Sequence, residues 1–191
     1  MTILYYAVHI IIAVIIVGYL LGRLILSMLG KEDIRVDTSA PFTVVEKDSE
    51  HITLKKRLPY HNEGGSCATI MDAFNRIQLP YEQFDGIEAR GKAEREGEVR
   101  ADDYFEAVLI QKKGDKNGED KLNIDALVTL RPRGKKSLAE VLSEMTGKNV
   151  DLAMDFIWME TGRTPWHYRK IRLEIGALEL AKLAGVTPKE S

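Results

Sequence analysis

The feature that most constrains this chain is an apolar stretch at its start. Residues 3–22 carry no fixed charge, and only His9 can titrate there. As an α-helix this stretch would be ~30 Å long, which matches the hydrocarbon thickness of a bilayer. A cleaved signal peptide would instead need a basic start, a shorter apolar core and small residues at the cleavage site. The sequence therefore predicts a retained transmembrane anchor, residues 1–30.

The charges beside this stretch predict the side of the membrane on which the rest of the chain lies. No Lys or Arg precedes the stretch, whereas Arg23, Lys31 and Arg35 follow it closely. Because basic residues concentrate on the cytoplasmic side of membrane helices, we expect the N-terminus outside and the C-terminal domain in the cytoplasm. A lone Cys67, which cannot form a disulfide within the chain, agrees with that compartment.

Two features of the predicted anchor bear on what it contacts. Gly18 and Gly22 form a GxxxG pair, a spacing that lets two helix backbones approach closely, although glycine is also common in membrane helices in general. His9 lies on the opposite side of the helix at ~100° per residue. A polar residue facing lipid is costly, so we expect His9 to meet a protein group or the headgroups. Self-association through Gly18 and Gly22 is the corresponding hypothesis.

The rest of the chain consists of short runs in which apolar and polar residues alternate, separated by turn residues. After a linker, residues 31–41, the pattern predicts strands at 42–45, 52–58, 67–79, 87–94, 104–111, 122–130, 150–158 and 166–175. Residues 67–79 also have helical spacing, and 178–183 fit a strand or a helix. The charged face of 87–94 suits a sheet edge, whereas the apolar run 104–111 predicts a central strand.

One helix interrupts these strands and fixes the expected fold class. Ser137 and Glu140 form a capping box, an apolar stripe follows, and Gly147 stands where a helix ends. Short strands with too few helices for crossover connections predict a mainly-β domain, residues 42–184, built as an antiparallel sandwich and followed by a tail, 185–191. An immunoglobulin-like arrangement is an open alternative, although its Cys…Trp…Cys pattern is absent.

Common motifs for nucleotide binding, zinc binding and serine hydrolysis are absent from the sequence. A thiol site would have to pair Cys67 with a histidine such as His61 or His167, but nothing fixes their spacing. A small buried cysteine is the simpler interpretation. We therefore expect no cofactor, no metal and no enzymatic activity.

Two groups of side chains are candidate contact surfaces. A basic cluster, which is either a solvated face or a contact for anionic lipid headgroups, comprises Arg131, Arg133, Lys135 and Lys136. A second group has the residue types enriched at binding hot spots, or else forms the core of a hairpin: Trp158, Arg163 and Trp166. Nucleic acid is not an expected partner, because the net charge is −2 and no aromatic residues interleave with the basic ones.

The anchor, the β-rich domain and the missing catalytic motifs predict a membrane-anchored, non-enzymatic interaction or assembly module, such as a subunit or scaffold of a membrane-associated complex. The expected partners are the lipid bilayer and either another protein or a second copy of the chain bound through the helix. The alternative is a small ligand-binding domain or enzyme whose site no motif reveals.

Overall fold

The computed structural model describes residues 2–78, 86–99, 101–116 and 118–187. In chain order the elements within these residues are α1 (Thr2–Met28), β1 (Ile34–Val36), β2 (Thr43–Lys47), β3 (Ile52–Asn62), β4 (Ala68–Gln78), β5 (Ile87–Arg95), β6 (Tyr104–Ile110), β7 (Lys121–Pro132), α2 (Leu138–Gly147), β8 (Leu152–Thr161), β9 (His167–Ile175) and α3 (Ala177–Leu183).

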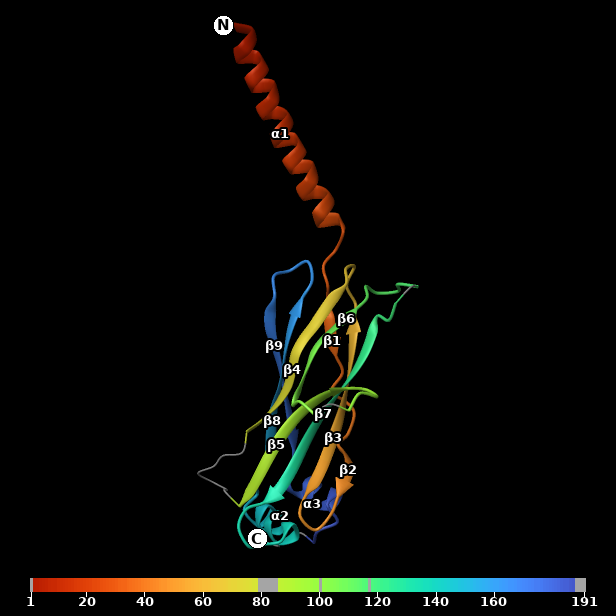
Figure 1. Cartoon of the computed structure of the whole chain (residues 1–191), viewed down its shortest axis with the longest axis vertical. Coiled ribbons are helices and arrows are strands. Elements are labelled where there is room, and N and C mark those ends of the chain that lie inside the picture. The colour runs from red at the N-terminus through yellow and green to blue at the C-terminus, as the bar shows by residue number, and fades with distance from the viewer. Residues whose placement is uncertain (1, 79–85, 100, 117, 188–191) are drawn as a thin grey trace.

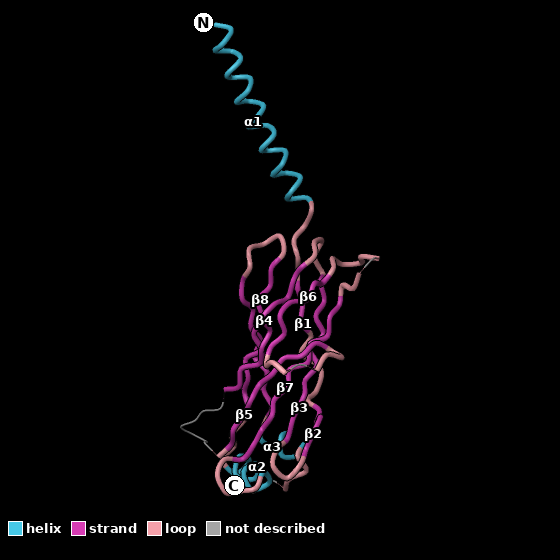
Figure 2. The backbone as a smooth tube through the Cα atoms, viewed as in Figure 1, coloured by secondary structure: helices cyan, strands magenta, loops and turns pink. Residues whose placement is uncertain are grey.

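The strands form two antiparallel sheets that pack face to face. In the first sheet β1 and β2 both pair with β3, followed by β7 and β5; the second has the order β6-β4-β8-β9. Alternate side chains of both sheets point inward and make one apolar core, in which Tyr60 of β3 meets Trp158 of β8 edge to face at 5.3 Å between ring centroids. The strands run along the long axis of the molecule (Figure 2). The predicted antiparallel sandwich is confirmed.

Two helices close the end of the sandwich that lies opposite α1, which we call the far end (Figure 1). Ser137 caps α2 as predicted, since its hydroxyl accepts the N–H of Glu140 and the Glu140 carboxylate accepts the N–H of Ser137. The apolar stripe of α2 is buried, and the ambiguous segment 178–183 lies in α3. The sandwich therefore has two helices, α2 and the short α3, where the sequence predicts one inserted helix.

The strand predictions hold for most of the sandwich, with one error of position. Residues 67–79 contain a strand, β4, with a bulge between Met71 and Phe74 and a positive φ of 48° at Asp72. β5 is an edge strand as expected, but β6 is also an edge strand and not a central one, and its Leu109 is exposed. An apolar run records local burial tendency, whereas the place of a strand in a sheet depends on which distant strands pair with it.

The predicted linker, residues 31–41, is wrong because it contains β1. Ile34 pairs with Asn62 at the end of β3 and is buried, so this segment is part of the first sheet. Phe42, directly after it, is also buried. The helix is therefore joined to the sandwich by a folded segment and not by a flexible tether.

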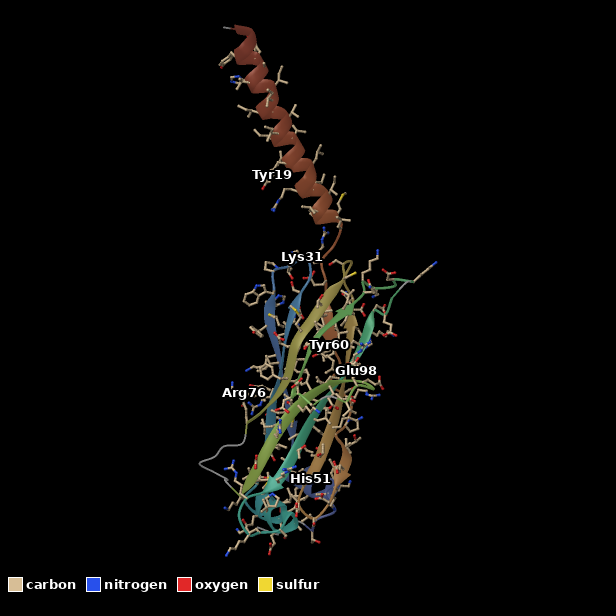
Figure 3. The ribbon with its side chains drawn as sticks, in the orientation of Figure 1. Tyr19, Lys31, His51, Tyr60, Arg76 and Glu98 are labelled. Carbon is tan, nitrogen blue, oxygen red and sulfur yellow. The ribbon has the colours of Figure 1, made fainter. Side chains whose placement is uncertain are left out.

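Helix α1 extends from the sandwich without packing along it (Figure 1). Among the described residues it is the one helix long and apolar enough to cross a membrane, over Tyr5–Met28, and none of that segment is buried. Figure 3 shows Tyr19 on the surface of this helix and Lys31 where the helix meets the sandwich.

Candidate functional site at the junction of helix and sandwich

The end of the sandwich next to α1 is built from three chain segments, residues 26–33, 62–66 and 161–164, which we call the junction. A buried asparagine organises it. The Oδ1 atom of Asn62 accepts the backbone N–H groups of Gly64 at 2.9 Å and Asp33 at 3.3 Å. Its Nδ2 atom donates to the carbonyl oxygens of Ser66 at 2.8 Å and Gln111 at 3.0 Å. All four hydrogen-bonding positions of the amide are used, so this side chain fixes several backbone segments at once.

Glu32 binds the turn between β8 and β9. Its Oε2 atom accepts the N–H of Arg163 at 2.9 Å and the hydroxyl of Ser66 at 3.2 Å. Its Oε1 atom accepts the N–H of Thr164 at 2.9 Å and the hydroxyl of the same residue. Partial burial raises the pKa of Glu32, but the hydrogen bonds to its ionised form outweigh that effect and lower the pKa to about 2. At neutral pH a charged carboxylate therefore joins the start of the folded domain to this turn.

Arg163 extends from the same turn to the last turn of α1. Its Nη1 atom lies 3.4 Å from the carbonyl oxygen of Leu26 and 3.4 Å from that of Gly30. The last carbonyls of a helix have no partner inside the helix, and a cation beside them is favourable. Arg163 thus caps α1 from the sandwich.

Close backbone contact at Gly64 completes the junction. A Cβ atom at this position would lie 2.3 Å from the carbonyl oxygen of Lys31 and 2.5 Å from the backbone nitrogen of Asp33, so only glycine fits. The backbone N–H of Glu63 donates to the carbonyl oxygen of Asp33 at 2.8 Å, and that of Gly65 donates to the carbonyl oxygen of Lys31 at 2.9 Å. Together with Asn62, Glu32 and Arg163, these contacts fix the chain where it leaves the helix.

The three predicted hot-spot residues do not form one surface. Trp158 is 1% exposed, and its Nε1 atom donates to the carboxylate of Glu160 at 3.1 Å, so it belongs to the core. Arg163 is exposed and contacts the end of α1. Trp166 is exposed, beside the exposed ring of Tyr168 at 6.4 Å between centroids. Of the two alternatives, the hairpin core therefore holds for Trp158, while Arg163 and Trp166 are exposed.

The predicted basic cluster lies at the far end. Arg131 is in β7, and Arg133, Lys135 and Lys136 lie in the connection that leads to α2. Figure 1 places α2 at the end opposite α1. Lys136 forms an ion pair with Glu144 at 2.5 Å. This location does not support contact between the cluster and a membrane that α1 would cross.

The candidate residues of α1 lie on an open helix surface. A Cβ atom at Gly18 or Gly22 would meet no atom within 4 Å. Next to Gly18 the helix has a shallow apolar groove, whose other walls are Ile10, Ala13, Val14, Val17 and Leu21. His9 has a partner in its own helix, since its Nδ1 atom lies 2.7 Å from the carbonyl oxygen of Tyr5.

In the described part of the chain, the residues considered for a thiol site or a metal site are not brought together. The Cys67 thiol donates to the side-chain oxygen of Gln111 at 3.0 Å and not to a histidine. Within the described ranges, no three His, Cys, Asp or Glu side chains could together hold a metal ion.

Sequence reasoning found part of the junction and missed its centre. Arg163 was a candidate, though as a partner contact. Asn62 and Glu32 were not, because an asparagine before two glycines indicates only a turn, and an isolated glutamate carries no signal. Their partners lie up to 132 residues away in the sequence.

Comparison with known proteins gives no family. No family model matches the chain, and no curated protein matches it. Among solved structures the chain is similar to the yeast GGA1 GAE domain, with 8% identity, a TM-score of 0.36, and coverage of 74% of this chain and 90% of that one. It is likewise similar to the GAE domain of GGA2p from Saccharomyces cerevisiae, with 9% identity, a TM-score of 0.34, and coverage of 76% and 96%. Superpositions at this level carry no conclusion about function.

Proposed function

We propose that the chain is a single-pass membrane protein that holds a β-sandwich at the membrane surface as a non-enzymatic interaction or assembly module. The observation that carries this proposal is the exposed apolar helix. The 24 residues of Tyr5–Met28 have no buried member. They span ~36 Å, enough for a hydrocarbon layer of ~30 Å. A helix that is apolar on all sides and packs on nothing requires a lipid or protein environment.

The junction supports a structural role for the anchor. Arg163 of the β8–β9 turn contacts the helix end, and Glu32, four residues after the helix, binds the same turn; both contacts favour a set orientation of the sandwich relative to α1. A partner protein would then meet a defined face of the sandwich at a defined height above the bilayer. This arrangement suits a subunit or scaffold of a membrane-associated complex.

Anchoring and orientation can be tested on the full chain in cells. We expect the protein to stay in the membrane fraction after alkaline carbonate extraction, which removes peripheral proteins. Following the positive residues Arg23, Lys31 and Arg35, we propose that the sandwich is cytoplasmic. Protease added to intact cells should leave it uncut, and permeabilisation should expose it. Release by carbonate would overturn the anchor, and digestion in intact cells would reverse the orientation.

Self-association through α1 is the second part of the proposal. The surface around Gly18 and Gly22 is open and apolar, and small residues allow close helix packing. Gly18→Ile should hold two helices apart and markedly reduce cross-linked dimer. Leu20→Ala is the matched control, since residue 20 lies on the opposite face of the helix and should leave the dimer unchanged. Equal dimer in Gly18→Ile and the unmodified chain would contradict the helix contact.

A ligand-binding or enzymatic function has less support. A hollow of about 260 Å³ lies over β5 and β7, lined by side chains of both charge signs: Glu88, Arg90, Lys92, Asp103 and Arg131, with Ala101 and Thr129. Pockets for small molecules are mostly apolar, whereas charged side chains line most of this hollow. Arg90 and Asp103 already pair with each other at 2.8 Å.

A further inference from the structure

An exposed aromatic pair lies beside the point where α1 leaves the sandwich. Trp166, directly before β9, and Tyr168 in β9 are 65% and 60% exposed, and their ring centroids lie 6.4 Å apart in an edge-to-face arrangement. Buried aromatic rings contribute most to packing, and two large rings left in water next to each other need an explanation. Their neighbour Arg163 is bound to the last turn of α1, so the pair belongs to the junction end of the molecule (Figure 1).

The length of α1 sets the depth at which this pair would lie in a membrane-anchored chain. The apolar span of 24 residues is ~36 Å long, about 6 Å more than the hydrocarbon layer, so its end enters the headgroup layer. That layer is about 5–7 Å thick on each side. Arg163 contacts the carbonyls of Leu26 and Gly30 at this depth. Trp166 is three residues further along, at most about 11 Å of extended chain.

The distribution of aromatic residues along the helix points to the same place. Membrane helices commonly carry Trp or Tyr at both interfaces, where an apolar ring with a polar atom fits the headgroup region. The start of α1 has Tyr5 and Tyr6, but no aromatic residue follows Tyr19 before the sandwich begins. An aromatic pair supplied by the β8–β9 turn would complete the second interface.

We propose that Trp166 and Tyr168 insert into the phospholipid headgroup layer of the membrane crossed by α1, making the β8–β9 turn a second membrane contact. This inference rests on the proposed membrane anchor. It gives the aromatic pair a lipid partner and not a protein partner, because Arg163, three residues before Trp166, contacts the end of the apolar span. The tilt of the sandwich is then fixed at two points, the helix and the turn.

Tryptophan fluorescence tests this directly in full-length protein reconstituted into phosphatidylcholine vesicles. Lipids carrying bromine on the acyl chains close to the headgroup quench tryptophans at that depth, and lipids carrying bromine near the chain ends quench deeper ones. The chain has two tryptophans, and Trp158 in the core serves as an internal reference. We expect loss of part of the emission with the shallow quencher and a smaller loss with the deep one. Trp166→Phe should abolish the lipid-quenched part.

A matched control places a tryptophan at the far end. Leu178 in α3 is 63% exposed, so Leu178→Trp in the Trp166→Phe background should be quenched by acrylamide from the water and not by brominated lipid. If Trp166 itself behaves like this control while the protein resists carbonate extraction, the anchor stands and the second contact is wrong. If Trp166 is shielded from both quenchers, a protein surface covers it, which also overturns the lipid contact. Release of the protein by carbonate would overturn both proposals.

Discussion

The two ends of the sandwich are closed by different kinds of interaction. At the far end, α2 and α3 bury apolar side chains such as Leu142 and Leu180. At the junction, Asn62 and Glu32 hold backbone groups of distant segments by hydrogen bonds. The free energy gained by burying apolar side chains scales with the buried area and tolerates small changes in geometry. A buried polar group left without its partner, by contrast, costs about 1–3 kcal/mol. The junction should therefore depend more on single atoms than the far end does, and Glu32 should make it respond to acid.

The largest effect is expected for Asn62→Ala, which removes all four hydrogen bonds of the buried amide. If two of the four backbone partners stay unpaired, the free energy of unfolding falls by about 2–6 kcal/mol. Denaturant titration of the full chain in detergent micelles measures this loss. Asn123→Ala is the control, because Asn123 binds the exposed Glu96 side chain and its loss should cost less than about 0.5 kcal/mol. Equal effects of the two variants would contradict a special role for Asn62.

A smaller and pH-dependent effect is expected for Glu32→Gln. The pKa of Glu32 is lowered from 4.5 to about 2 in the folded protein. A carboxylate with a lowered pKa adds stability that is fully present above pH 4.5 and is lost as the pH falls towards 2. The variant should therefore be less stable than the unmodified chain at pH 7, and the two should converge near pH 2. Denaturant titrations across this range measure the difference.

The control for this measurement is Glu98→Gln. Glu98 is exposed and pairs with Arg95, three residues away, at 3.3 Å. Exposed ion pairs contribute about 0–1 kcal/mol, so this variant should follow the unmodified chain at every pH. A constant difference between Glu32→Gln and the unmodified chain from pH 7 to 2 would show that the charge of Glu32 does not matter.

The smallest effect is expected at the far end for Ser137→Ala, which removes the cap of α2. The expected loss is about 1 kcal/mol. Because Ser137 caps α2 and Asn62 belongs to the junction, and their hydrogen bonds share no partner, the losses in the double variant should add within about 0.5 kcal/mol. Denaturant titration of the two single variants and the double variant measures the three free energies of unfolding that this double-mutant cycle compares with the unmodified chain. A larger deviation would show that the two ends are coupled.

Much of the sandwich follows from local patterns. Alternation in 122–130 predicts β7, the capping box at Ser137 predicts α2, and the small and charged residues of 87–94 predict an edge strand. Each of these signals lies within one element, because the sequence period reports which side chains share a face. The same reasoning fails for β6, whose apolar run cannot report how many neighbours the strand has.

The apolar helix α1, most of the strands and the capped helix α2 can be predicted from residues that lie close together in the chain. By contrast, the packing of the two sheets makes Trp158 a core residue and leaves Trp166, eight positions later, exposed. The same packing pairs β1, which lies within 31–41, with β3, and brings Asn62 and Glu32 to the segments that they join at the junction. The physical reason is that these outcomes depend on partners many residues away, and a hydrogen bond or a buried face acquires its partner only when the sheets have formed.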